Sequence, residues 1–415
     1  MPIEPSGITF TEQCDSVGVS GEEEILNNGF PNTLVGRDLT LGSSQNSINS
    51  TQTGISDFYN RTRTRISGFY NSGIINTGDS NDLIIATAGY GDLIPDTDEY
   101  RISGIHNTGT LNTGEGNDLI LGLRYTQGKF RYSDRDSNGI FNEGGTIDTG
   151  GGDDTITGIA QGFLSIGIEQ NSSNPNLQSP VIIKTGNGND TIAGTGEYMG
   201  IRFGSINGST IDTGEGDDAI TGTGDYYGLV LYSSFLTTGG GHDAITGIST
   251  QGEAISNSST INTGDGNDTI TGTSTYSIAI SNTGTINTGD GNDTIIGIRT
   301  DNRFGPTISN SGTINTGKGA DSIITDSSFS NLGNIFLGKG TDYIRGFGYG
   351  TLYAGKDEDS LELTSGSYTV EISGTAVSFT SSGGTIKTSE FEKLIAGSTT
   401  YDFSSLTSGQ TIVVA

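Results

Sequence analysis

The sequence is poor in the residues that build an ordinary hydrophobic core. Of its 415 residues 31% are hydrophobic, there is no tryptophan, and glycine occurs 68 times. A chain with so little apolar surface stays disordered unless something other than a large core offsets the conformational entropy lost on folding. The composition therefore argues against an ordinary globular domain and directs attention to repeats and ligands.

Several further features are scarce. Cys14 is the single cysteine, so an intramolecular disulfide framework is excluded. All apolar runs are short, so no transmembrane helix is expected. The opening residues, MPIEPSGITFTEQ, have neither a basic n-region nor an apolar h-region, and we expect no Sec-type signal peptide there.

Basic residues are also few. Nineteen bases stand against 48 acids, which gives a formal net charge of −29. This charge argues against nucleic acid and anionic membranes as partners. A chain that folds with so many acids needs counter-ions.

What the sequence does have is a repeat. A turn of the form TGxGxD occurs eleven times, at intervals of 36, 36, 36, 28, 25, 25, 25, 28, 21 and 17 residues. Near-constant periods of this size indicate a solenoid in which each repeat forms one coil. The final aspartates of the turns are Asp82, Asp118, Asp154, Asp190, Asp218, Asp243, Asp268, Asp293, Asp321, Asp342 and Asp359.

Two columns of apolar residues accompany the turns. A lone Ile or Leu between small polar residues indicates one inward side chain on a short strand. The column after the turns is Ile84, Ile120, Ile156, Ile192, Ile220, Ile245, Ile270, Ile295, Ile323, Ile344 and Leu361. The column before them is Ile75, Leu111, Ile147, Ile183, Ile211, Leu236, Ile261, Ile286, Ile314, Ile335 and Leu352.

A third short strand precedes each turn, as in SIAISN (Ser277–Asn282). Three strands per coil predict an all-β fold, a parallel β-helix or β-solenoid with one glycine-aspartate turn per coil, a narrow Ile/Leu core and capped ends. The 36-residue coils carry about 11 extra residues, which we expect after the DxIxG strand along one side of the solenoid.

A recurring asparagine supports the same stacking. Identical amides at strand spacing form hydrogen bonds from one coil to the next. The rungs that lead to Asp190 and Asp243 lack this residue, so the ladder should break there. Its predicted members are Asn71, Asn107, Asn142, Asn207, Asn257, Asn282, Asn310 and Asn331.

The turn composition predicts a cation site. Its glycines permit positive φ, so that backbone carbonyl oxygens point at a common point, and the aspartate adds a carboxylate. Turns stacked about 4.8 Å apart can share a cation between neighbours. Hard oxygen ligands in this number suit calcium better than magnesium, zinc or copper. We expect up to about ten Ca²⁺ ions in one column, held by the eleven aspartates and turn carbonyls, and folding that depends on them.

These turns resemble the calcium-binding nonapeptide of RTX (hemolysin-type calcium-binding repeat) proteins, GGxGxDxUx. This chain has TGDGNDTIT, TGEGDDAIT, TGGGHDAIT and TGKGADSII, and the resemblance spans about residues 75–363. It departs from the family pattern in several ways. Thr usually replaces the first Gly, Ser80 and Asp357 replace a later Gly, and Lys318, Lys339 and Lys356 enter the last three turns. The roughly 25-residue period implies one calcium column, where the family's shorter coil has two.

The resemblance also implies a destination and a domain plan. RTX proteins leave Gram-negative bacteria through a type I exporter that reads an uncleaved C-terminal signal, which places this protein outside the cell. We expect an N-terminal cap over residues 1–52, calcium-binding repeats over 53–362, and a C-terminal β cap with the secretion signal over 363–415. The expected role is structural, in a matrix, sheath, S-layer or fibril, with self-assembly through exposed sheet edges.

Three alternatives remain open at the level of the sequence. The segment DRDSNG predicts an extra calcium loop through Asp134, Asp136 and Asn138. Arg61, Arg63 and Arg65 would suit a solenoid that binds or modifies polysaccharide, although no HExxH or GxSxG motif occurs and we expect no enzyme. Outward TIT triplets at 155–157 and 269–271 would suit ice binding, but most coils break the row.

Overall fold

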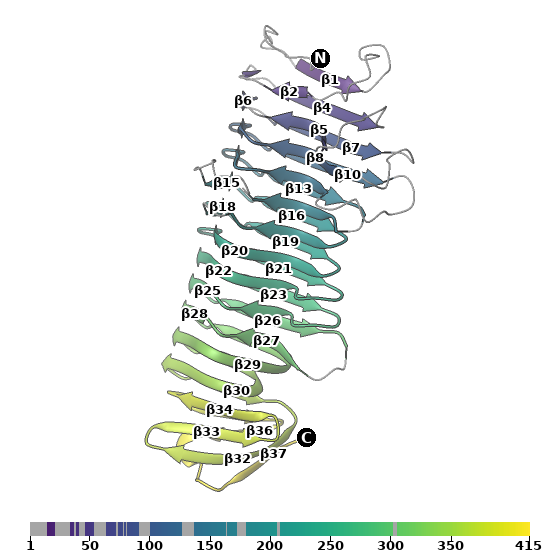
Figure 1. Cartoon of the computed structure of the whole chain (residues 1–415). Helices are drawn as coiled ribbons and strands as arrows, with labels where there is room; N and C mark the ends of the chain where they lie inside the picture. Colours follow the sequence, from purple (N-terminus) through teal and green to yellow (C-terminus); the bar gives the residue numbers. More distant parts are fainter. Residues whose placement is uncertain are drawn as a thin grey trace. The chain divides into compact units, whose positions relative to one another are not determined.

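The computed structural model describes residues 15–20, 34–36, 39–40, 46–53, 64–71, 74–77, 79, 81–90, 100–126, 137–162, 164–171, 180–205, 208–301 and 305–415. The chain divides into two compact units, Met1–Phe235 and Leu236–Ala415. In both, parallel strands of successive coils pair with one another, as Figure 1 shows. The predicted β-solenoid fold is confirmed. Among the described residues no helix is long and apolar enough to cross a membrane.

Three columns of parallel strands form the first unit. The column after the turns holds β1 (Asp15–Ser20), β4 (Asn46–Thr53), β7 (Leu83–Tyr90), β10 (Leu119–Thr126), β13 (Thr155–Ala160), β16 (Thr191–Gly196) and β19 (Ala219–Gly224). The middle column holds β2 (Leu34–Gly36), β5 (Thr64–Asn71), β8 (Tyr100–Asn107), β11 (Asn138–Asn142), β14 (Ile166–Gln170), β17 (Met199–Phe203) and β20 (Tyr227–Thr237). The column before the turns holds β3 (Leu39–Thr40), β6 (Ile74–Asn76), β9 (Thr110–Asn112), β12 (Thr146–Asp148), β15 (Val181–Lys184) and β18 (Ser209–Asp212).

The second unit repeats this plan and then changes it. Its parallel strands are β21 (Ala244–Ser249), β22 (Ile255–Asp265), β23 (Thr269–Ser274), β24 (Ile280–Asn282), β25 (Thr285–Asp290), β26 (Thr294–Arg299), β27 (Pro306–Asn310), β28 (Thr313–Lys318), β29 (Ser322–Lys339), β30 (Tyr343–Lys356) and β31 (Ser360–Leu363). Antiparallel pairs enter with β32 (Gly366–Ser373), β33 (Ala376–Ser381), β34 (Gly384–Ser389), β35 (Lys393–Ala396), β36 (Thr399–Asp402) and β37 (Thr411–Val414), beside a 3₁₀ turn at Phe403–Ser405.

Strand pairing changes at one of the two expected domain boundaries and not at the other. Pairing changes from parallel to mixed just after Leu363, where the C-terminal β cap is expected to begin. At the other end, no change of pairing accompanies residue 52, because β4 pairs in parallel with β7. Strands from the region expected to be a cap thus continue the solenoid ladder.

Every member of the two predicted apolar columns is buried, with at most 2% of its surface exposed. Strands such as β13 alternate buried and half-buried residues, as expected for one inward face. The interior is narrow enough to need glycine as well: a Cβ on Gly158 would lie 2.3 Å from the carbonyl oxygen of Gly167. The core is therefore a thin stack of Ile and Leu, closed by close backbone contact.

The asparagine ladder is confirmed where the structure describes it. Side-chain Nδ2 donates to Oδ1 of the next rung at 2.7–2.9 Å from Asn71 to Asn107 to Asn142, and from Asn257 to Asn282 to Asn310 to Asn331. Gln170 follows Asn142 in register, which gives the predicted break before Asp190.

Two details of the predicted coils need correction. The sequence predicted Asn207 at the rung that follows Gln170, but the residue aligned with Gln170 is Phe203. Asn207 lies outside the described residues. The sequence did not reveal this register because the coils differ in length. In the third 36-residue coil the extra residues, 171–180, fall between β14 and β15 and do not follow the DxIxG strand. Either corner accepts an insertion because neither lies in the buried stack.

Candidate functional site: the carboxylate row at the turns

The eleven aspartates of the turns form a hydrogen-bonded row in each unit. In the first unit the backbone N–H of each aspartate donates to Oδ1 of the next, at 2.7–2.8 Å, from Asp82 to Asp218. In the second unit the same bonds, at 2.8–2.9 Å, run from Asp243 to Asp359. In the nine aspartates that follow the first of each row, Oδ1 thus holds two coils together. All eleven residues are at most 2% exposed.

The second carboxylate oxygen has a different environment. In eight of these residues Oδ2 is buried and accepts no hydrogen bond: Asp118, Asp154, Asp190, Asp268, Asp293, Asp321, Asp342 and Asp359. A buried carboxylate oxygen with no donor is costly, and a row of them at strand spacing is costlier because like charges repel. The arrangement needs either protons or cations to neutralise it.

The pKa values of the row follow from this environment. Burial raises the pKa of Asp118 to about 6 and that of Asp154, Asp321 and Asp359 to about 7. Neighbouring aspartates raise these pKa values further, whereas the backbone hydrogen bond lowers them, and the hydroxyls of Thr149 and Thr316 also lower those of Asp154 and Asp321. Burial likewise raises the pKa of Asp190, Asp268, Asp293 and Asp342.

Glycine gives the turns their conformation. Gly289 has φ of +101°, and a Cβ there would lie 1.9 Å from the carbonyl oxygen of Gly264 in the preceding turn. Asp357 replaces the second glycine of the last turn; that glycine has φ of +124° to +144° in the other described turns, whereas Asp357 has φ of +92°. The last turn therefore keeps a positive φ at this position, with the strain expected for a non-glycine residue.

The threonine that opens most of the turns has a structural function. Its hydroxyl donates to the main-chain carbonyl of the equivalent threonine in the next turn, as from Thr113 to Thr149 at 3.4 Å and from Thr263 to Thr288 at 3.1 Å. These threonines are fully buried. A glycine at this position would leave that hydrogen bond unmade.

The residue before each aspartate forms an exposed ladder of its own. Asn117 accepts the N–H of Asp153 through Oδ1 at 2.9 Å, and Asp153 accepts that of Asn189 at 2.8 Å. His242 occupies this position, and its Nδ1 accepts the N–H of Asn267 at 2.8 Å. The imidazole ring accepts this hydrogen bond in place of the usual amide or carboxylate.

The turn carbonyls differ from the expectation. Gly151 O accepts the N–H of Gly116 at 2.6 Å, and Gly114 O accepts the N–H of Gly151 at 3.2 Å. These two carbonyl oxygens therefore join neighbouring turns through hydrogen bonds. Among the described residues no three His, Cys, Asp or Glu side chains gather within metal-binding reach. A cation in the row would have two successive carboxylates as its side-chain ligands, completed by main-chain oxygens and water.

The fit of this row to a hard divalent cation rests on the eight buried Oδ2 atoms that accept no hydrogen bond, and among the described ion pairs none joins one of these eight aspartates to a lysine or arginine. Lys318 pairs outward with Asp290 Oδ2 at 2.5 Å, and Lys393 pairs with Glu358 and Asp402. Neither lysine pairs with a member of the row. Carboxylate and main-chain oxygens are the ligands that Ca²⁺ prefers.

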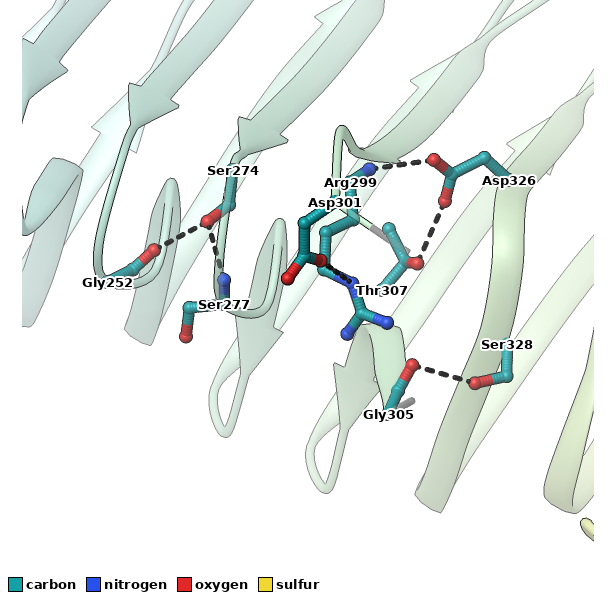
Figure 2. A network of polar contacts seen from close by, with 9 residues as sticks. All are labelled: Gly252, Ser274, Ser277, Arg299, Asp301, Gly305, Thr307, Asp326 and Ser328. Carbon is teal, nitrogen blue, oxygen red and sulfur yellow. Dashed lines mark hydrogen bonds and ion pairs between the residues drawn. The ribbon is translucent and has the colours of Figure 1, made fainter. Parts of the chain in front are cut away.

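A second polar cluster lies at a corner of the second unit (Figure 2). Asp326 accepts the N–H of Arg299 at 2.8 Å and the hydroxyl of Thr307 at 2.9 Å, while the Arg299 side chain approaches Asp301 at 3.0 Å. Nearby, Ser274 donates to Gly252 O and Ser328 donates to Gly305 O. Both oxygens of Asp326 are engaged in holding the corner, so we assign it a structural role.

The predicted extra calcium loop falls mostly outside the described residues. Asp134 and Asp136 lie there, and Asn138 is buried in β11. Arg61 and Arg63 also lie outside the described residues, as does Cys14. The extra calcium loop and the basic cluster stay predictions.

Comparison with known proteins assigns no function to this chain. No protein-family model and no curated protein matches this chain. Among solved structures, the chain is similar to a hyperactive, Ca²⁺-dependent, β-helical antifreeze protein from an Antarctic bacterium, at 16% identity and a TM-score of 0.40, over 81% of this chain and 84% of the other. Both values are too low to carry a function to this chain.

The raised pKa values predict an unusual pH dependence for the calcium-free protein. A carboxyl whose pKa is higher in the folded than in the unfolded state stabilises the fold below its unfolded pKa, and this contribution is lost as pH rises through the folded value. The folded pKa values of Asp118, Asp154, Asp321 and Asp359 are about 6 to 7. The temperature at the midpoint of thermal unfolding in chelator should therefore decrease as the pH is raised from about 4 to about 8. A midpoint that rises over this range would contradict the assigned protonation.

Proposed function

We propose that this protein is a secreted, calcium-binding β-solenoid with a structural or surface role, in which a row of Ca²⁺ ions in each unit neutralises the aspartates of the turns. The observation that carries the proposal is the row of buried Oδ2 atoms with no hydrogen-bond donor. The net charge of −29 supports it, because divalent ions would cancel much of that charge. Export by a type I system and assembly into a matrix, sheath, S-layer or fibril belong to the same proposal and follow from the RTX resemblance.

The experiment that tests calcium binding is a count of bound ions. The protein is dialysed against chelator, then against millimolar calcium, and the retained calcium is measured by atomic emission and native mass spectrometry. Ions shared between successive turns would number four among the five aspartates of the first unit and five among the six of the second. Retention of no more than one or two ions, or equal retention of magnesium, would refute the proposal.

A second candidate function, ice binding, is favoured by the outward face of the strands after the turns. Outward positions of β13 and β23 are Thr155, Thr157, Ile159 and Thr269, Thr271, Thr273, all partly exposed. The outward residues of β16, β19, β21 and β26 are likewise uncharged. Uncharged surface repeated over several coils is unusual in so acidic a chain and indicates an interaction surface.

Thermal hysteresis of a calcium-loaded solution tests this candidate. If the face binds ice, the wild type should depress the freezing point below the melting point, and Thr271→Lys should abolish most of the effect because a charge on the face holds its own hydration. The matched control is Thr285→Lys, on the half-buried outward side of β25 in a different column. No hysteresis in the wild type excludes ice binding and leaves the calcium proposal intact.

A further inference from the structure

The C-terminal cap places one more carboxylate at the end of the row. Strand β35 pairs in parallel with β31, with Ser360 opposite Lys393. Glu392 therefore precedes β35 as Asp359 precedes β31. The N–H of Asp359 donates to Glu392 Oε2 at 2.9 Å, within the 2.7–2.9 Å range of the bonds between successive aspartates.

A main-chain hydrogen bond of the preceding coil is also repeated here. Lys393 N–H donates to Asp359 O at 2.9 Å, as Ser360 N–H donates to Asp342 O at 2.8 Å one coil earlier. The connection differs, because Ser389 aligns with Tyr353 and only three residues, 390–392, lead from β34 to β35. No glycine-aspartate turn is present, and so the TGxGxD pattern could not reveal this rung.

The last aspartate needs a partner on the cap side. Asp359 is fully buried, and its Oδ2 accepts no hydrogen bond. Lys393, the residue after Glu392, is engaged elsewhere, because it pairs with Glu358 and Asp402. No ion pair of Glu392 is among the described contacts.

We propose that Glu392 is the terminal ligand of the cation row and binds, together with Asp359, one further divalent cation between the last coil and the C-terminal cap. This inference rests on the proposed calcium binding. The glutamate is one methylene longer than aspartate, which suits a ligand that reaches the row from a shorter connection. The cation then attaches the cap to the solenoid and neutralises the carboxylate that would otherwise end the row unpaired.

The test compares ion counts for the full chain and its variants. Glu392→Gln keeps an oxygen that accepts the Asp359 N–H but removes the charge, so it should bind one calcium ion fewer than the wild type. Glu390→Gln removes a charge two residues away, on a residue that makes no bond to Asp359, and should retain the full count. Glu392→Asp should restore the charge and recover the missing ion with lower affinity.

Hydrogen exchange gives a local readout that does not depend on the count. Calcium should protect the amides around Asp359 in the wild type and in Glu390→Gln, and this calcium-dependent protection should be lost in Glu392→Gln. An unchanged count and unchanged protection in Glu392→Gln would overturn the inference while calcium binding elsewhere stands. A wild type that binds no calcium would instead refute the proposed function itself. If Glu392→Gln does not fold, Glu392→Asp takes its place. At limiting calcium this variant should bind one ion fewer than the wild type, and an unchanged count would overturn the inference.

Discussion

Removal of calcium at about pH 8 is expected to unfold both units. Each calcium-free unit would bury five or six ionised carboxylates in a row, and an unpaired buried ion costs roughly several kcal/mol. A folded domain is stable by only about 5–15 kcal/mol, so the summed cost exceeds what the narrow Ile/Leu core can offset. Burial of the row is therefore tolerable only when its charge is neutralised.

Far-UV circular dichroism and hydrodynamic radius measure this unfolding directly. At about pH 8 chelation should remove the strand signal and expand the chain, and added calcium should restore both. The control is chelation at about pH 5, below the folded pKa values of about 6 to 7, where protons replace the ions and much of the fold should survive. A spectrum at pH 8 that does not change on chelation would show that the carboxylates need no cation.

Asp268→Asn should have opposite effects with and without calcium. In calcium the variant loses a ligand and should be destabilised by about 3–5 kcal/mol, because neighbouring buried charges lose their partner. In chelator at about pH 6 it should be stabilised by about 1–3 kcal/mol, because the amide still accepts the Asp243 N–H through its oxygen and folding no longer requires either a buried charge or the uptake of a proton at this position.

Urea unfolding of the wild type and of this variant, in each medium, gives the two free-energy differences. Asp265→Asn is the matched control, since Asp265 is exposed, three residues away, and should change stability by less than about 0.5 kcal/mol in either medium. Destabilisation of the same size in both media would mean that the Asp268 carboxylate acts through hydrogen bonds alone.

Much of the fold could be predicted because a solenoid repeats local patterns. Each coil places Ile or Leu at the same offsets from the turn, and stacking in register leaves those side chains no position except the interior, as with Ile156 and Ile270. The asparagine ladder was predictable for the same reason. Where coil length varied, the prediction failed: Phe203 lies at the rung assigned to Asn207, and the third insertion lies at another corner.

For the candidate site, the sequence by itself determined which eleven aspartates recur, at what period, and that the chain carries a net negative charge large enough to require counter-ions. These properties follow from spacing and composition. Only the tertiary structure decided what each atom does. Oδ1 accepts an N–H from the preceding coil, Oδ2 is buried without a donor, and turn carbonyls bond to neighbouring turns. Glu392 joins the row through a shorter connection that carries no motif. These roles depend on contacts between residues 17 to 36 positions apart, which strand register sets and local sequence does not.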